Sequence, residues 1–147
     1  MRGAAGLVSF LRTGSLGVLH TGVPYADILK LLGPAEACIN DVNPVYRYSQ
    51  IEIYVNGTTG VIWMVQLEPF NGMVKVPSPL EAGSYIDIPP NRAALVSFLD
   101  KWGIVHDIGE FHVTGQEELR IQESGVFVFY ADDGQVTSLV AEGPLPR

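Results

Sequence analysis

The sequence is poor in the residues and motifs that mark disulfides, metal clusters and common active sites. It holds one cysteine, Cys38, so neither an internal disulfide nor a cysteine-based metal cluster can form. A reducing compartment such as the cytoplasm is the expected location. The Walker A, GxGxxG, GxSxG and SxxK motifs are all absent. These absences predict a protein that is not an enzyme and that needs no cofactor or metal.

Long apolar runs and basic residues are also scarce. No apolar stretch approaches the roughly 20 residues that span a bilayer. The short run after Arg2 is interrupted by Arg12, so neither a membrane segment nor a signal peptide is expected. Lys and Arg number 9 against 16 Asp and Glu, a net charge of −7, which disfavours direct binding of nucleic acid. The charge suits a basic protein partner, and a solvated acidic surface also explains it.

Two stretches of the chain share one pattern. Residues 51–65, IEIYVNGTTGVIWMV, consist of an apolar run, a turn with glycine and a second apolar run. Residues 126–140, VFVFYADDGQVTSLV, repeat this order 75 positions later, with the same length. Each stretch predicts a β-hairpin. The apolar fraction of 47% and charged fraction of 17% indicate a folded protein.

Helix signals precede both hairpins. Residues 24–32 begin with a proline that favours a first helical turn, and residues 92–102 follow Asn91, a good N-cap. Their apolar residues lie 67 positions apart: Ile28, Leu29, Leu31 and Leu32 in one, and Leu95, Val96, Phe98 and Leu99 in the other. A shorter helix is expected near residues 4–11. Strands are predicted at 45–48, 51–55, 61–67, 85–88 and 118–121, with a loop over 35–44.

Together these elements predict an α+β fold. The unit is a short lead strand, a helix and three antiparallel strands, used twice, as a tandem repeat that forms an antiparallel sheet with two helices on one face. Helix-then-hairpin patterns are common, so a chance match is the alternative. Residues 1–147 form one domain: repeat 1 over about 15–68, a connector over 69–83 and repeat 2 over about 84–142, with an 8-residue insertion within 105–115.

The strands supply the candidate binding residues. If the helices cover the face with Ile51, Ile53, Val126 and Val128, then Tyr54, Phe127 and Phe129 lie on an open face. The alternative is that the N-terminal segment or the connector covers that face. Aromatic and acidic residues on an open sheet are typical of protein contacts. The candidates for partner binding are Glu52, Tyr54, Trp63, Phe127, Phe129, Asp132 and Asp133.

Other reactive residues give weaker signals. His20, His106 and His112 fall in different predicted segments, and exposed or locally bonded histidines explain them better than a metal site. Cys38 is expected to be a small buried residue rather than a nucleophile. Glu117 and Glu118 are expected to begin a strand rather than to form a catalytic pair.

Three runs of the chain resemble a group of small uncharacterised actinobacterial proteins: LRTGSLGVLHTGVPYADILKLLGPAE, YRYSQIEIYV and VIWMVQLEPF. Those proteins are similar in style to immunity proteins of polymorphic toxin systems. The duplicated helix and strands are also similar in topology to the tandem-repeat β-lactamase inhibitory proteins, which are secreted and disulfide-bonded and grip an enzyme with an open sheet; this analogy transfers no residues. The resemblance implies a non-catalytic protein that binds and neutralises a toxin. The expected partner is a basic domain of that toxin. The alternatives are a small-ligand-binding or enzymatic domain with a pocket between sheet and connector, using His106, His112 or Asp107, and a structural domain or homodimer.

Overall fold

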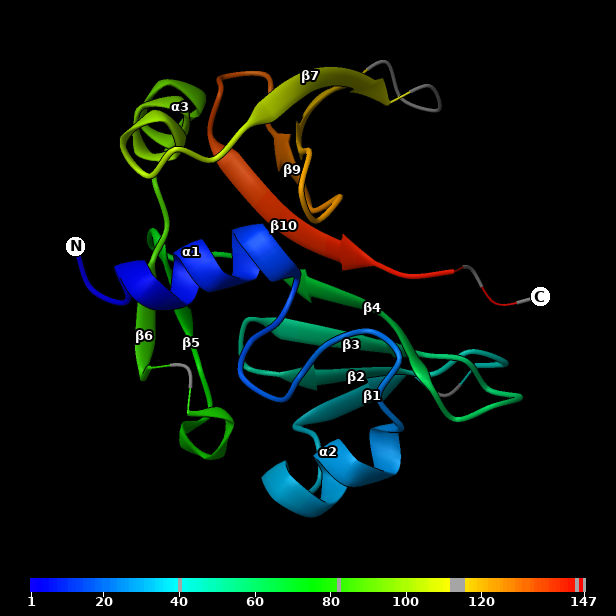
Figure 1. The fold of residues 1–147 in the computed structure, drawn as a ribbon. Helices are drawn as coiled ribbons and strands as arrows, with labels where there is room; N and C mark the ends of the chain where they lie inside the picture. Colours follow the sequence, from blue (N-terminus) through cyan, green and yellow to red (C-terminus); the bar gives the residue numbers. More distant parts are fainter. Residues whose placement is uncertain (40, 82, 112–115, 145, 147) are drawn as a thin grey trace.

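The computed structural model describes residues 1–39, 41–81, 83–111, 116–144 and 146, with the side chains of 109–111, 116 and 117 left aside. These residues form three α-helices, an eight-stranded antiparallel sheet and a two-stranded sheet (Figure 1). The α+β class with an antiparallel sheet is as predicted. No helix in the described part is long and apolar enough to cross a membrane.

The main sheet consists of two meanders, each of which follows a helix. The first comprises helix α2 (Tyr25–Leu32) and strands β1 (Ala37–Ile39), β2 (Val45–Tyr48), β3 (Ile51–Val55) and β4 (Ile62–Leu67). The second comprises helix α3 (Arg92–Lys101) and strands β7 (His106–Phe111), β8 (Gln116–Ile121), β9 (Phe127–Tyr130) and β10 (Val136–Glu142). The strand order is β1-β2-β3-β4-β10-β9-β8-β7, so β4 and β10 join the meanders at the centre. The element order is the same in both halves, while the duplication itself stays a prediction.

Two of these strands occupy segments in which no strand was predicted. The predicted loop over 35–44 contains β1, and the predicted insertion over 105–115 contains β7, while residues 112–115 lie outside the described part. Three residues are too few for alternation to show in β1, and β7 includes aspartate, glycine and glutamate, which are rare in strands. Each half therefore contributes four strands to the sheet rather than three.

The two central hairpins differ in the length of their turns. In the β3–β4 hairpin, residues 56–61 connect the last two paired residues. In the β9–β10 hairpin, residues 131–135 do so, and this turn is one residue shorter. Since side chains alternate along a strand, this difference places Val65 and its predicted equivalent Val140 on opposite faces of the sheet.

The lead strands and the connector lie outside the main sheet. The segment at residues 85–88 yields β6 (Tyr85–Asp87), which pairs with β5 (Met73–Lys75) of the connector in the two-stranded sheet. A 3₁₀ helix, η1 (Ser78–Leu80), lies between them. The N-terminal extended piece is a single bridge between Leu16 and Leu19. The strand predicted at 85–88 is therefore present, but the prediction that the lead strands belong to the main sheet is wrong.

All three helices pack on one face of the sheet. Helix α1 (Ala4–Thr13) buries Leu7, Val8, Phe10 and Leu11, as its spacing predicts, and lies next to β6 in Figure 1. In α3 the buried residues are Leu95, Phe98 and Leu99. The predicted stripe of α2 is confirmed at Ile28 and Leu32, which face the core, and is wrong at Leu29 and Leu31, which are both 41% exposed. The buried residues of the three helices share one core cluster with the inner sides of the strands and with the connector.

Candidate functional site

The face of the sheet that lies away from the helix core is called the outer face here. Residues that pair directly across antiparallel strands share a face, so the strand registers identify its side chains. A central row crosses all eight strands: Ala37, Arg47, Glu52, Gln66, Val140, Phe127, Arg120 and Asp107. An apolar row runs beside it on β1 to β4: Ile39, Val45, Tyr54 and Met64. The buried apolar residues of the described N-terminal helix and connector belong to the core cluster on the inner face instead.

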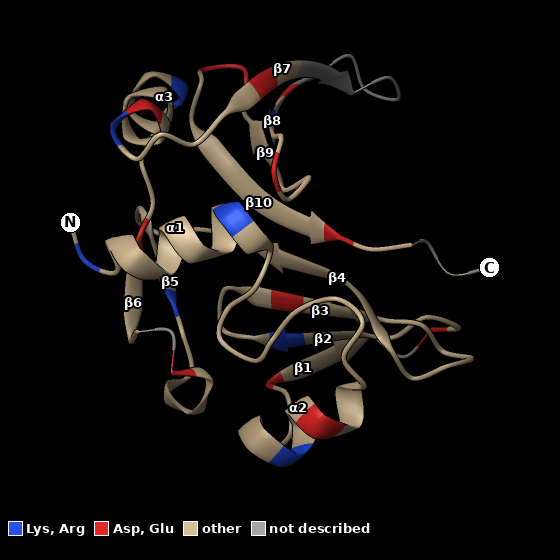
Figure 2. Cartoon of the chain, viewed as in Figure 1, with Lys and Arg blue, Asp and Glu red and all other residues tan. Residues whose placement is uncertain are grey.

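A polar network occupies the first half of the outer face. Arg47 donates from Nη2 to Glu52 Oε1 at 2.6 Å and lies 3.6 Å from Glu68 Oε2. The Tyr54 hydroxyl donates to Glu52 Oε2 at 3.0 Å, and Gln66 Nε2 donates to Glu68 Oε1 at 3.0 Å. Figure 2 shows the basic and acidic segments of β2 and β3 side by side. Each carboxylate therefore has a specific partner, and the network is held in one arrangement.

The two carboxyl groups of this network differ in acidity. Burial raises the pKa of Glu52, but hydrogen bonds from Arg47, Glu68 and Tyr54 outweigh it and hold that pKa below its usual value. Burial, the hydrogen bond with Glu52 and the charge of Glu52 raise the pKa of Glu68. Burial and the Glu52 charge raise the pKa of Tyr54 to about 12. Glu68 is thus the carboxyl that takes up a proton first as the pH falls.

A β-bulge places Trp63 beside the apolar row. The register of β3 against β4 shifts between Tyr54 and Val55, so one extra residue of β4 is accommodated there. The Trp63 ring meets the Tyr54 ring edge-on, with centroids 5.8 Å apart. Its Nε1 is buried and has no hydrogen-bond partner among the described residues. Tyr54, Trp63 and Met64 are half-buried, as expected for side chains on a sheet face flanked only by their neighbours.

The second half of the outer face is more tightly covered by its own side chains. The Arg120 guanidinium lies 5.6 Å from the centroid of the Phe127 ring and 3.3 Å from Glu118 Oε1. The ring of Phe129 meets Phe127 nearly perpendicularly, at 5.2 Å. Phe127 is only 7% exposed and Val140 only 2%. Phe127 therefore lies on the predicted face but supports Arg120 and Phe129 rather than offering much surface itself.

The remaining predicted candidates, Asp132 and Asp133, lie elsewhere. Both are in the turn of the β9–β10 hairpin, where Asp133 accepts the N–H of Gln135 at 2.9 Å. The same turn is bound to the start of α3, because Arg92 donates its N–H to Gly134 O at 3.0 Å. The turn thus joins the helix side of the molecule, and the structure does not bring these two aspartates together with the outer-face residues.

The reactive residues of the described part lie on separate elements or on opposite faces of one strand. His106 and Asp107 are adjacent on β7, so their side chains point to opposite faces. Asp107 accepts a hydrogen bond from Gln122 at 2.8 Å, and His112 lies outside the described residues. No group of His, Cys, Asp and Glu in the described part could hold a metal ion. Cys38 is exposed, which contradicts the expected burial, because β1 is an edge strand.

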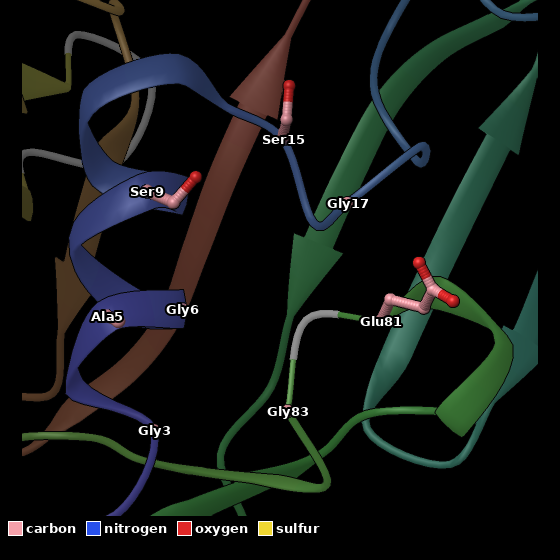
Figure 3. A pocket seen from close by; sticks show the side chains of 8 residues that line it. All are labelled: Gly3, Ala5, Gly6, Ser9, Ser15, Gly17, Glu81 and Gly83. Carbon is pink, nitrogen blue, oxygen red and sulfur yellow. The ribbon is translucent and has the colours of Figure 1, made fainter.

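A pocket of about 400 Å³ lies between α1 and the connector (Figure 3). Its lining is small and weakly polar: Gly3, Ala5, Gly6, Ser9, Ser15, Gly17, Glu81 and Gly83. The carboxylate of Glu81 and the hydroxyls of two serines are its side-chain polar groups. The predicted alternative placed a pocket between sheet and connector, whereas this one faces the N-terminal helix.

The sequence-based candidates missed several residues of the outer face. Arg47, Gln66 and Glu68 belong to the polar network, and Arg120 covers Phe127. The alternation in Val45–Tyr48 already places Arg47 opposite the tyrosines of its strand, and this signal could have identified it. No protein-family model, curated protein or solved structure matches the chain. The function is therefore argued from the geometry.

Proposed function

We propose that this chain is a non-catalytic protein-binding module, most specifically a cytoplasmic immunity protein that binds and neutralises a basic toxin domain. One observation carries the proposal: the outer face of an eight-stranded sheet lies away from all three helices and carries aromatic and charged side chains. Tyrosine, tryptophan and arginine dominate the energetics of protein interfaces, and all three types occur on this face. The net charge of −7 supports a basic partner.

Co-expression with the product of the adjacent gene in the native genome tests this proposal. Cells that carry a toxic neighbour are expected to grow when the chain is present. Tyr54→Ala and Phe129→Ala, on the outer face, should weaken both the rescue and the complex measured by calorimetry. Leu29→Ala is the matched control, because Leu29 is an exposed apolar residue on α2.

Two results would count against the proposal. One is the absence of any complex or rescue with adjacent gene products. The other is a complex that is weakened by Leu29→Ala and unaffected by the two outer-face variants. Circular dichroism of each variant separates lost binding from lost folding.

The pocket beside α1 favours a second candidate function, the binding of a small ligand. A volume of about 400 Å³ lies within the range of small-molecule sites, and Glu81 offers it one charge. A thermal-shift screen against small polar and cationic metabolites tests this candidate. A ligand that raises Tm for the parent chain but not for Ser9→Leu, which fills the pocket, would favour it over the protein-binding module.

A further inference from the structure

The apolar row of the outer face extends to the edge of the sheet. Its outermost member, Ile39, lies on β1, which ends the strand order, and is 65% exposed. Tyr54 and the bulge residue Trp63 add two aromatic rings to the row. Single exposed apolar residues are ordinary, but a continuous row with two aromatic rings is typical of a contact surface.

A second pocket lies at the β1 end of this row. Its volume is about 240 Å³. Ala37, Ile39 and Val45 supply apolar walls, and Arg47 and Glu52 supply a charged end. A cavity of this size is smaller than typical small-ligand sites and suits one side chain of a partner.

Carboxylates outnumber bases along the borders of the row. Glu142 pairs with Met64 at the end of the row that lies at the centre of the sheet. Glu52 and Glu68 lie in the neighbouring polar network, where Arg47 is the single base. Since Arg47 is already bound to Glu52, the local charge is negative. A partner that covers the apolar row must therefore bring cationic groups to these carboxylates.

The two edges of the sheet differ in a way that favours β1 as the contact edge. Strand β7 carries Asp107 and Glu110 in its sequence, and charged residues on an edge strand discourage pairing with other chains. Strand β1 has the sequence Ala-Cys-Ile without any charge, and all three residues are exposed. The apolar row of the first half thus reaches an edge strand without charge, whereas the edge strand of the second half carries acidic residues.

We propose that the apolar row of Ile39, Val45, Tyr54 and Met64, together with Trp63 beside it, binds a cationic amphipathic segment of a protein partner. Apolar side chains of that segment cover the row, one of them enters the pocket at β1, and its Lys or Arg side chains meet Glu52, Glu68 and Glu142. This inference rests on the proposed protein-binding function and names the partner chemistry and the half of the sheet that it uses.

A synthetic peptide of alternating leucine and lysine is the probe. Trp102→Phe leaves Trp63 as the single tryptophan, so its fluorescence reports on the row. The peptide is expected to shift this emission to shorter wavelength, and its affinity should fall with added salt. Ile39→Ser should weaken binding about tenfold, the loss expected for one apolar contact. Ile108→Ser is the matched control, because Ile108 is 61% exposed on the opposite edge strand.

The charge requirement is tested with a leucine–glutamate peptide and with the double variant Glu52→Gln, Glu68→Gln. Failure of the acidic peptide to bind, with weaker binding of the basic peptide to the double variant, supports the inference. Equal binding of both peptides, or equal losses in the Ile39 and Ile108 variants, overturns it. So does a self-associated dimer in sedimentation that Ile39→Ser disperses, since the row would then bind a second copy. An adjacent-gene complex that protects only β8–β10 from hydrogen exchange would overturn this inference and leave the proposed function standing.

Discussion

Arg47 and Arg120 occupy the same cross-strand row of the outer face, each on the second strand from an edge of the sheet. Five strand spacings separate them, about 24 Å along the sheet. Arg47 forms an ion pair with Glu52, whereas Arg120 forms one with Glu118 and also lies over the ring of Phe127. Both halves of the outer face therefore place a cation at the same position in the row. Its surroundings are a polar network in the first half and a covered aromatic cluster in the second.

Because Glu52 and Glu68 lie close together, Glu68→Gln should raise the unfolding free energy by an amount that depends on pH. The folded-state pKa of Glu68 is raised above its unfolded value, so its stabilising contribution is complete below about pH 4.3 and is lost as the pH rises through the folded pKa. Glutamine cannot ionise, so the variant should gain about 0.5 kcal/mol over the parent at pH 7, a small value because Glu68 is 40% exposed. Urea unfolding between pH 4 and pH 8 measures this difference, and a variant less stable than the parent at pH 7 would contradict it.

Removal of the Tyr54 hydroxyl should lower the unfolding free energy. Tyr54→Phe deletes a 3.0 Å hydrogen bond to Glu52 and should cost about 1 kcal/mol of unfolding free energy at pH 7. Because the folded-state pKa of Glu52 is lowered, this contribution is present above the unfolded pKa and fades as the pH falls through the folded one. Tyr85→Phe on β6 is the exposed control. Equal losses in both variants would show that the bond to Glu52 adds nothing.

The N-terminal helix should be part of the core rather than an accessory. Leu7 is fully buried in the shared core cluster, so Leu7→Ala should lower the unfolding free energy by about 2–5 kcal/mol. Val18→Ala, at a residue that is 55% exposed, should change it by less than about 0.5 kcal/mol. Chemical denaturation followed by circular dichroism gives both values. A small loss at Leu7 would mean that α1 does not pack on the inner face in solution.

The contact between the N-terminal segment and the connector should depend on Gly17. A Cβ at this position would lie 1.9 Å from the Leu80 carbonyl oxygen, in a left-handed residue with φ of 59°. Gly22 is also left-handed, but a Cβ there meets nothing within 4 Å. Gly22→Ala should therefore cost about 1 kcal/mol, the conformational penalty alone, and Gly17→Ala clearly more. Equal melting temperatures for the two variants would contradict the close approach.

Local patterns in the sequence determined much of the architecture. The alternation in Ile51–Val55 assigns Ile53 to the core and Tyr54 to the outer face, because a strand turns successive side chains to opposite sides. Proline and asparagine before the apolar segments predict α2 and α3, since each suits the start of a helix. These signals depend only on neighbouring residues, which is why the sequence alone contains them.

Only the tertiary structure decided how these elements meet. The three-residue strand β1 exists because β2 offers it a pairing edge, and no pattern of its own predicts it. The junction of β4 with β10 creates the row that contains Arg47 and Arg120, two residues far apart in the chain. A one-residue difference between two turns moved Val140 to the outer face. Local alternation thus determines which side chains share a strand face, whereas register and strand order, which depend on contacts between distant segments, determine the surface they form together.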